Sequence, residues 1–170
     1  MSIQQLTDQY LDQVFRFLCV LIQDRDTAAD LTQDTFLKLQ DLPRSNELPS
    51  EAYVLATARN TALSWLRRRK LERKHVEVLT HDELNLQGKS SRAEAPDRVI
   101  ESRELGAALD AALEALPEDF RVVFHLSEVE GLSYAHIAEV VDCPTGTVAS
   151  RKHLAVQRLR AHLKESGHAL

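Results

Sequence analysis

Hydrophobic positions in the first part of the chain recur every three or four residues, which is the spacing of a buried helix face. In the first such stretch they are Leu6, Tyr10, Val14, Phe17, Leu18 and Leu21. A second helix is expected after Asp26, its candidate N-cap, with apolar contacts from Ala29, Leu31, Phe36, Leu37 and Leu39. Ser50 is placed to cap a third helix, whose apolar positions are Tyr53, Val54, Ala58, Ala62, Leu63, Trp65 and Leu66. The pattern predicts a three-helix unit over residues 1–75.

Two segments lack the helical spacing of hydrophobic residues. Residues 41–50 are rich in Pro, Ser and Asn, so we expect a loop there. Residues 76–96 include the run Gly88-Lys89-Ser90-Ser91 and are expected to form a flexible linker. The predicted organisation is therefore one domain over residues 1–75, a linker over 76–96 and a second domain over 97–170.

The second domain also shows a helical pattern. Asp97 is the expected start of a helix with an apolar stripe, and Pro117 fits the first turn of the next helix. Acids directly after Pro117 suit the helix dipole, and Gly131 is a plausible end of this helix. The stripe of the first of these helices consists of Leu105, Ala108, Leu109, Ala112, Leu113 and Leu116.

The last part of the chain predicts a helix-turn-helix. Residues 133–141 form a short amphipathic segment with Ser133 as its expected cap, and residues 142–145 form a tight turn around Pro144. A longer helix over residues 146–163 follows. A second helix that begins at a sharp turn can place its first residues in a DNA major groove. A plain helical hairpin is the alternative interpretation.

The amino-acid composition limits the possible fold classes. With 5 Gly and 5 Pro in 170 residues, a barrel or sandwich with its many turns is disfavoured, and we expect an all-α protein. The longest apolar stretch, residues 15–22, is shorter than the roughly 20 residues of a membrane span. No signal-peptide pattern precedes it, so we expect a cytoplasmic protein. Cys19 and Cys143 have no CxxC partner and are expected to be reduced thiols.

Charge is distributed unevenly around a net value of −5. Residues 67–75 carry six basic residues and one acid, and residues 143–170 carry five basic residues and one acid. The segment between them over residues 101–142 carries ten acids and two basic residues. Local Lys and Arg, not the net charge, decide whether phosphates can bind, so two cationic surfaces are candidates for nucleic acid. Solvated helix ends are the alternative.

Two groups of motifs resemble one known family. Glu130-Gly131-Leu132-Ser133-Tyr134, Ile137-Ala138, Asp142-Cys143-Pro144 and Gly146-Thr147-Val148 with Ser150-Arg151 resemble region 4 of bacterial extracytoplasmic-function (ECF) sigma factors. In the first half, residues 30–37 (DLTQDTFL) resemble region 2.2, and residues 58–62 (ARNTA) with 65–69 (WLRRR) resemble regions 2.3 and 2.4. The motifs occur in family order and cover nearly the whole chain.

The resemblance implies partners and roles. It implies that region 2.2 docks on the β′ clamp helices of core RNA polymerase through Asp30, Gln33 and Asp34. It implies a minus-10 promoter surface of Asn60, Arg59, Arg67, Arg68, Arg69 and Lys70, with Asn60 at a pocket for a flipped base to which the loop 41–50 contributes. It implies a minus-35 surface of Thr147, Ser150, Arg151, Lys152, His153 and Arg158. The family also implies contact with the polymerase β flap and control by an anti-sigma factor.

Each role has a plainer alternative. The polar residues of region 2.2 can form an ordinary solvated helix face, and Tyr53 and Trp65 are expected to be core residues instead of base-stacking platforms. Ala149 and Leu154 stand where many family members carry a basic residue, and His136 stands where many carry an acid. We therefore expect an unusual minus-35 preference in which Lys152 and His153 matter more than Ala149.

An enzyme has little support in the sequence. It contains no Gly-rich phosphate loop, no G-x-S-x-G elbow and no clear paired-carboxylate site, and its seven histidines lack metal-ligand spacing. We expect no cofactor, no metal and no small-molecule substrate. Two rivals remain besides a sigma factor. One is a stand-alone helix-turn-helix regulator, and the other is a helical adaptor that binds no nucleic acid.

Overall fold

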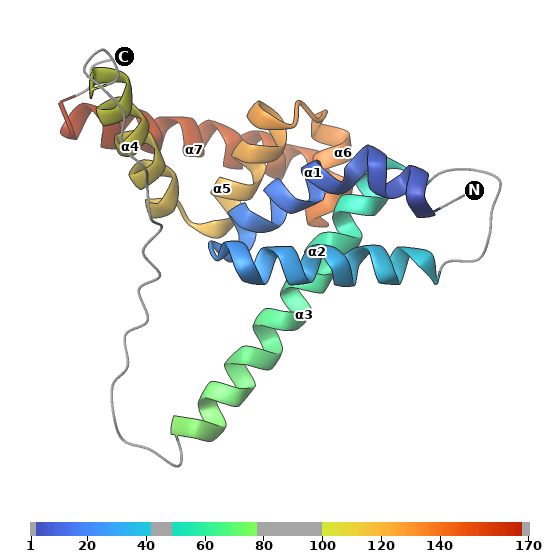
Figure 1. Cartoon of the computed structure of the whole chain (residues 1–170). Coiled ribbons are helices and arrows are strands. Elements are labelled where there is room, and N and C mark those ends of the chain that lie inside the picture. The colour runs from blue at the N-terminus through green and yellow to red at the C-terminus, as the bar shows by residue number, and fades with distance from the viewer. Residues whose placement is uncertain (1–2, 42–48, 78–99, 168–170) are drawn as a thin grey trace. The chain divides into compact units, whose positions relative to one another are not determined.

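The computed structural model describes residues 3–41, 49–77 and 100–167, and every element within these ranges is a helix (Figure 1). Contacts divide the chain into two compact units, Met1–Lys89 and Ser90–Leu170. The all-α class expected from the sequence is confirmed. The predicted start of a helix at Asp97 and most of the predicted loop and linker lie outside the described residues.

Three helices make up the first unit: α1 (Ile3–Ile22), α2 (Arg25–Gln40) and α3 (Glu51–Glu77). Each of them packs against the other two (Figure 1). The stripe predicted on α1 forms the centre of the core, where Val14, Phe17 and Leu18 are completely buried. Burying each such side chain contributes about 1.5 to 3 kcal/mol, so this stripe is the main apolar support of the unit.

The start of α2 differs from the sequence prediction. Asp24, not Asp26, is its N-cap, and the Asp24 carboxylate accepts hydrogen bonds from the Thr27 backbone N–H, at 3.1 Å, and from the Thr27 hydroxyl. Asp26 lies in the first turn, where the helix dipole favours an acid. Aspartate is a good N-cap at either position, so the sequence alone did not decide between two helix starts that are two residues apart.

The Asp24 cap predicts a pH-dependent stability. The hydrogen bonds from Thr27 lower the pKa of the Asp24 carboxyl, with a smaller contribution from Arg69. A lowered folded-state pKa gives stability that is present above the unfolded-state pKa and is lost as the pH falls through the folded-state value. Asp24→Ala should therefore lower the melting temperature at neutral pH, and this difference should shrink in acid. Thermal melts of both proteins across a pH series check this, and a difference independent of pH would contradict it.

The buried side of α2 contains threonines as well as apolar residues. Thr32 and Thr35 are buried, and each hydroxyl donates a 2.7 Å hydrogen bond to a carbonyl one turn earlier, so burial leaves neither hydroxyl unsatisfied. The predicted apolar set was partly wrong, because Leu37 is 59% exposed and Ala29 is also exposed. The residues that form the buried face are Ala28, Leu31, Thr32, Thr35, Phe36 and Leu39.

Helix α3 begins as predicted, with the Ser50 hydroxyl accepting a 3.2 Å hydrogen bond from the Tyr53 backbone N–H. Tyr53 itself is 47% exposed, so its predicted core position was wrong, and Leu55 is buried on the core side instead. The helix continues to Glu77, which places the first two residues of the predicted linker in α3. A 2.6 Å hydrogen bond from the Gln13 amide to the Glu51 carboxylate ties α1 to the start of α3.

The second unit consists of α4 (Ile100–Ala115), α5 (Glu118–Phe124), a π-helical turn η2 (His125–Val129), α6 (Tyr134–Val141) and α7 (Thr145–Glu165). One core cluster joins α4 to α7 and is completed by side chains of α5. Leu105 and Leu109, predicted in the α4 stripe, are 39% and 38% exposed. The buried members of the cluster are Ala112, Leu116, Ala155 and Leu159, and Leu113, Phe120 and Phe124 pack against it.

The predicted helix-turn-helix is present in α6 and α7. Ser133 caps α6 by accepting a 3.2 Å hydrogen bond from the His136 backbone N–H. Asp142 ends α6 with a left-handed φ of 53°, a conformation that Asp tolerates better than most residues, and Pro144 precedes α7. Gly131, with φ of 69°, takes the same left-handed conformation ahead of Ser133. The turn between Asp142 and Pro144 therefore sets where α7 begins and separates its first residues from α6.

Candidate functional site

One open face of α2 carries the three polar residues singled out in the sequence. Asp30, Gln33 and Asp34 are all exposed, and they lie one helical turn apart or less. Leu37 continues the row by one more turn and is 59% exposed. The hydrophobic pattern predicted Leu37 as an apolar contact of α2 within the core, so this exposed apolar member of the face was not predicted. An exposed leucine beside acids and an amide makes this row suitable for contact with another protein.

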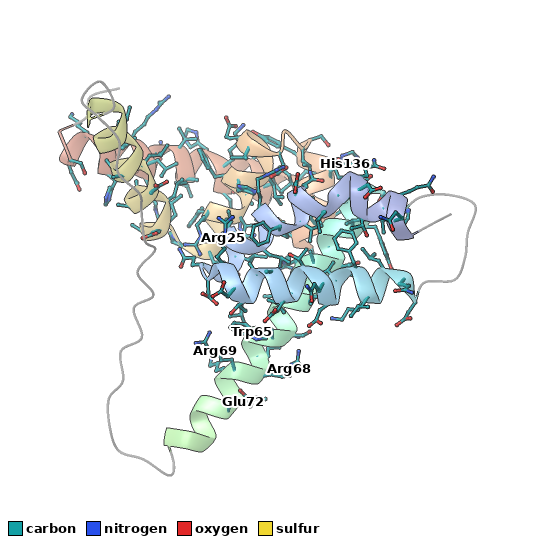
Figure 2. The ribbon with its side chains drawn as sticks, viewed as in Figure 1. Arg25, Trp65, Arg68, Arg69, Glu72 and His136 are labelled. Carbon is teal, nitrogen blue, oxygen red and sulfur yellow. The ribbon has the colours of Figure 1, made fainter. Side chains whose placement is uncertain are left out.

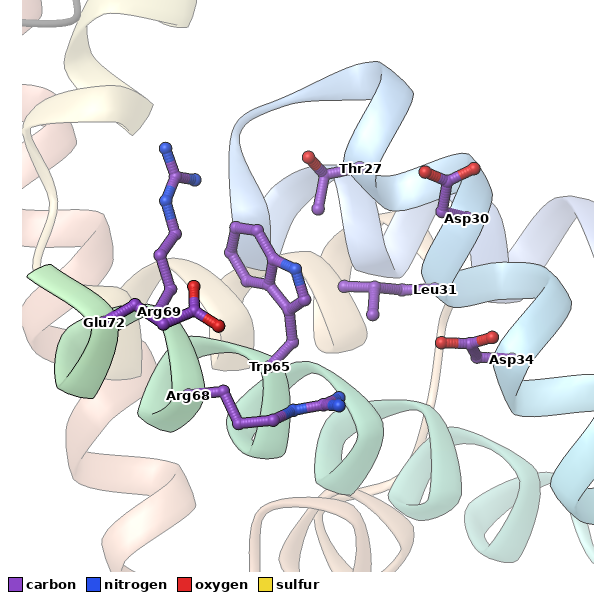
Figure 3. Close-up of a pocket in the computed structure, with 8 residues that line it drawn as sticks. All are labelled: Thr27, Asp30, Leu31, Asp34, Trp65, Arg68, Arg69 and Glu72. Carbon is purple, nitrogen blue, oxygen red and sulfur yellow. The ribbon is translucent and has the colours of Figure 1, made fainter.

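A pocket of about 540 Å³ lies between α2 and α3 (Figure 3). The α2 side supplies Asp30 and Asp34, whereas the α3 side supplies Arg68 and Arg69. These residues were predicted to contact different partners, yet the fold brings them to the rim of one cavity with opposite charges on its two sides. The complete lining consists of Thr27, Asp30, Leu31, Asp34, Trp65, Arg68, Arg69 and Glu72.

Trp65 forms the wall of this pocket and supports an arginine. Its ring stands between α2 and the Arg69 side chain, with Leu31 pointing toward it (Figure 3). The Arg69 guanidinium lies 4.9 Å from the ring centroid, within cation–π range. Trp65 is half-buried, so its predicted core position is only partly met. The arginine is thereby held in one orientation at the edge of the pocket.

The remaining residues of the predicted minus-10 surface follow α3 along its length. Asn60 is exposed and Arg59 is half-buried. Next to Asn60, the Thr61 hydroxyl accepts a 3.0 Å hydrogen bond from the Lys38 ammonium, which fixes α3 against α2. Farther along, Arg67, Arg68 and Lys70 are exposed, and Figure 2 shows the side chains of Arg68 and Arg69 extending from neighbouring positions of α3. Arg67, Arg68, Arg69 and Lys70 together form what we call the cationic rod of α3, and the Asn60 amide lies nearer the start of the same helix.

In α7 two of the predicted DNA-contacting arginines already have partners from α5. The Arg151 guanidinium lies 2.7 Å from the Asp119 carboxylate in a hydrogen-bonded ion pair. The Arg158 guanidinium lies 4.7 Å from the centroid of the Phe120 ring. No local sequence pattern indicates these contacts, because the partners are separated by 32 residues in the first case.

Lys152 also has partners within its own unit. Its ammonium group lies 2.6 Å from the Glu128 carboxylate and 5.5 Å from the centroid of the Tyr134 ring. The hydrogen bond with Lys152 lowers the pKa of the Glu128 carboxyl, and the same bond raises the pKa of the Lys152 ammonium. Lys152 is therefore directed toward η2 and α6.

The other residues predicted on the minus-35 surface differ in exposure. Ser150 and His153 are exposed, whereas Thr147 is half-buried. The Ser150 hydroxyl donates to the Thr147 carbonyl at 3.0 Å, and the His153 ring lies 3.0 Å from the Gln157 amide. The two positions that depart from the family pattern also differ, since Ala149 is half-buried and Leu154 is 40% exposed.

A buried histidine and glutamate support the turn before α6. Nε2 of His125 lies 3.1 Å from Oε1 of Glu130, and their side chains are 10% and 4% exposed. The pair spans η2, and Gly131 follows it directly. The sequence did not predict this pair. Residues five positions apart come together in a π-helical turn, whereas contacts in an α-helix join residues three or four apart.

Some features are absent from the part of the chain that the structure describes. There, no helix combines the length and apolar character needed to cross a membrane. No group of three or more His, Cys, Asp or Glu side chains in the described ranges is arranged to hold a metal ion.

The fold and these surfaces define a class: an all-helical protein of two units, the second of which is a helix-turn-helix. Family profiles agree with both halves. The profile for Sigma-70 region 2 matches residues 6–72, and the profile for Sigma-70, region 4 matches residues 106–159.

Similar proteins are named as sigma factors. The ECF RNA polymerase sigma factor SigE of Mycolicibacterium smegmatis is 32% identical over 163 residues, which span 95% of this chain and 62% of that protein. The ECF RNA polymerase sigma-E factor of Escherichia coli K12 is 30% identical over 171 residues, covering 87% of this chain and 90% of that protein. The sigma factor RpoE from Bartonella quintana, solved in complex with the anti-sigma factor NepR, has a TM-score of 0.67 and 25% identity, with 95% of this chain and 96% of that chain covered.

The chain therefore belongs to the extracytoplasmic-function group of the sigma-70 family of RNA polymerase sigma factors. Membership indicates a non-catalytic subunit of transcription initiation.

Proposed function

We propose that the protein binds core RNA polymerase and directs it to promoters that carry minus-10 and minus-35 elements. The observation that carries this proposal is the presence of both sigma regions in one chain, in order, each with exposed residues of the required chemistry. A stand-alone helix-turn-helix regulator has no use for the region 2 unit, and a helical adaptor has no use for the cationic rod of α3. The protein acts in the cytoplasm, where its polymerase is, and RNA synthesis takes place in the polymerase active site.

The polymerase contact is assigned to the α2 face of Asp30, Gln33 and Asp34, with Leu37 as its apolar member. These side chains are exposed and lie in one row, which suits docking on the β′ clamp helices. A mixed acidic and apolar row offers both steering and desolvated contact to a partner helix. The region 4 unit makes the second polymerase contact, at the β flap.

The promoter contacts are divided between the two units. Asn60 presents an amide that can donate to and accept from one base edge, and Arg59 together with the α3 cations holds the backbone of the minus-10 strand. The α7 residues Thr147, Ser150 and His153 lie at the start of the second helix of the helix-turn-helix, where base edges are within reach. Two arginines of the same helix, Arg151 and Arg158, serve the phosphates, and the Lys152 ammonium can donate to a base edge as well as to a phosphate.

Control by an anti-sigma factor is part of the proposal. The similar RpoE of Bartonella quintana was solved with its anti-sigma factor NepR, and its fold matches this chain over nearly its whole length. Such a partner has to cover the surfaces that polymerase and promoter use. It follows that the α2 face is a place where the anti-sigma factor and the polymerase compete.

Gel filtration with core RNA polymerase tests the proposal. The purified chain should elute with the core enzyme as a stable complex. Elution of the two components apart, with a core enzyme shown to be active, would favour a stand-alone DNA-binding protein instead.

Promoter recognition by α7 gives a further prediction. Lys152→Ala and His153→Ala should each change activity on some members of a set of minus-35 promoter variants, because these residues stand on the reading helix where Ala149 has no hydrogen-bonding group. Each lost base contact is worth about 1 to 3 kcal/mol of discrimination. Glu165→Gln, at the exposed C-terminal end of α7, is the control and should leave the order of promoters unchanged. Equal activity of both alanine variants on every promoter would contradict the assignment.

A further inference from the structure

Lys152 lies on the side of α7 that faces the preceding elements of its own unit. Its ammonium is held between the Glu128 carboxylate, at 2.6 Å, and the face of the Tyr134 ring, at 5.5 Å from the centroid. The lysine side chain is 25% exposed, whereas that of Glu128 is 44% exposed. The cation is thus the more enclosed member of the pair, and the carboxylate stands between it and part of the solvent.

The neighbouring cation is held in the same way. Arg151 forms its 2.7 Å ion pair with Asp119, and its side chain is also 25% exposed. Two successive cations near the start of α7 therefore each have a carboxylate partner from an earlier element of the same unit. The cations farther along the helix, Arg160 and Lys164, are exposed. The charge of α7 is compensated most strongly at the end where a helix-turn-helix approaches DNA.

An internal carboxylate competes with a DNA phosphate. Both are anions that hydrogen-bond to ammonium, so a phosphate gains Lys152 only if the lysine gives up Glu128. Once Lys152 has moved, the Glu128 carboxylate stays near the phosphates and repels them. The gain from such a contact is smaller than that from an unpaired lysine, and one cation fewer contributes to counterion release.

We propose that Glu128 limits the affinity of this helix-turn-helix for DNA by holding Lys152, so that DNA engages this lysine only by displacing the carboxylate. This inference rests on the proposed DNA contact of α7. It makes Glu128 a positioning residue that never needs to touch DNA. It also assigns a role to the acidic segment over residues 101–142. The negative charge of this segment weakens binding to DNA sequences that offer few other contacts.

The test is a salt series of DNA binding by the full-length protein. Glu128→Gln keeps the size of the side chain and removes its charge. With a fluorescein-labelled duplex of mixed sequence as the probe, it should raise the affinity about threefold, the range set by a partly exposed ion pair. The plot of log affinity against log salt concentration should become steeper by about 0.9, the value for one added phosphate contact.

Two controls separate this effect from a general change of charge. Glu139→Gln makes the same charge change on the exposed surface of α6 and should leave the salt slope as in wild type. In a Lys152→Gln background, Glu128→Gln should no longer steepen the slope, because the lysine that it releases is gone. Circular dichroism of each variant confirms that the helices are retained.

The outcomes are distinct. A steeper slope for Glu128→Gln that disappears in the Lys152→Gln background supports the proposal. A slope equal to wild type, or a change that persists without Lys152, overturns it while leaving the DNA contact of α7 intact. A wild-type protein without any salt-dependent affinity for the duplex overturns the DNA contact itself, and this proposal with it.

Discussion

The double substitution Gln33→Ala with Asp34→Arg is expected to abolish binding to core RNA polymerase. Both residues are exposed in the middle of the α2 face, so neither change disturbs the core. The arginine reverses a charge at the proposed contact, and like-charge juxtaposition across an interface costs several kcal/mol. Titration of labelled protein with core enzyme should show an affinity loss of at least about a hundredfold, equivalent to about 3 kcal/mol.

A charge reversal elsewhere provides the control. Asp12→Arg makes the same change at an exposed position of α1 and should keep wild-type affinity. Leu37→Ala, which shortens the exposed apolar member of the α2 face, should weaken binding to an intermediate degree. If the double variant keeps its affinity, the polymerase contact lies on another face of the protein.

Replacement of His125 by alanine is expected to destabilise the second unit by about 3 kcal/mol. The side chains of His125 and Glu130 are 10% and 4% exposed, and Nε2 of His125 lies 3.1 Å from Oε1 of Glu130. Removal of the imidazole leaves a cavity and takes away one polar partner of the buried Glu130 carboxylate. A buried polar group left unsatisfied costs about 1 to 3 kcal/mol, and the cavity adds to this cost. Urea denaturation of the full chain, followed by circular dichroism, measures the change.

Two further variants identify the cause of this loss. Addition of Glu130→Gln to His125→Ala removes the remaining charge and should recover part of the lost stability. His136→Ala removes an exposed histidine and should change the free energy of unfolding by less than about 0.5 kcal/mol. A His125→Ala protein as stable as wild type would show that the pair does not support the π-turn.

Helical periodicity predicted the elements well where one face is uniformly apolar. The α1 stripe follows this pattern, and Ser50 and Ser133 cap their helices as expected. The pattern was less informative in α2, where buried threonines replace apolar residues and an exposed leucine does not belong to the core. A threonine that bonds to its own helix backbone can be buried at little cost, which a hydrophobic count does not register.

The sequence indicated candidate residues for the site but not their contacts with one another. Exposure of Asp30, Gln33 and Asp34 followed from their polar character and spacing. The contacts of Lys152 with Glu128 and of Arg151 with Asp119 depend on how α7 packs against α5 and η2. No local pattern encodes these contacts, because each joins residues that are far apart in sequence and becomes visible only once the unit is folded.

Mapping of transcript starts on genomic DNA tests whether the protein directs core RNA polymerase to promoters. Core RNA polymerase is mixed with the purified protein on fragmented genomic DNA of the source organism, and the 5′ ends of the products are sequenced. We expect new starts, absent with core enzyme alone, that share two sequence elements at a fixed spacing upstream. They should disappear with the Gln33→Ala, Asp34→Arg variant. Starts identical to those of core enzyme alone would show that the protein does not direct the polymerase to promoters.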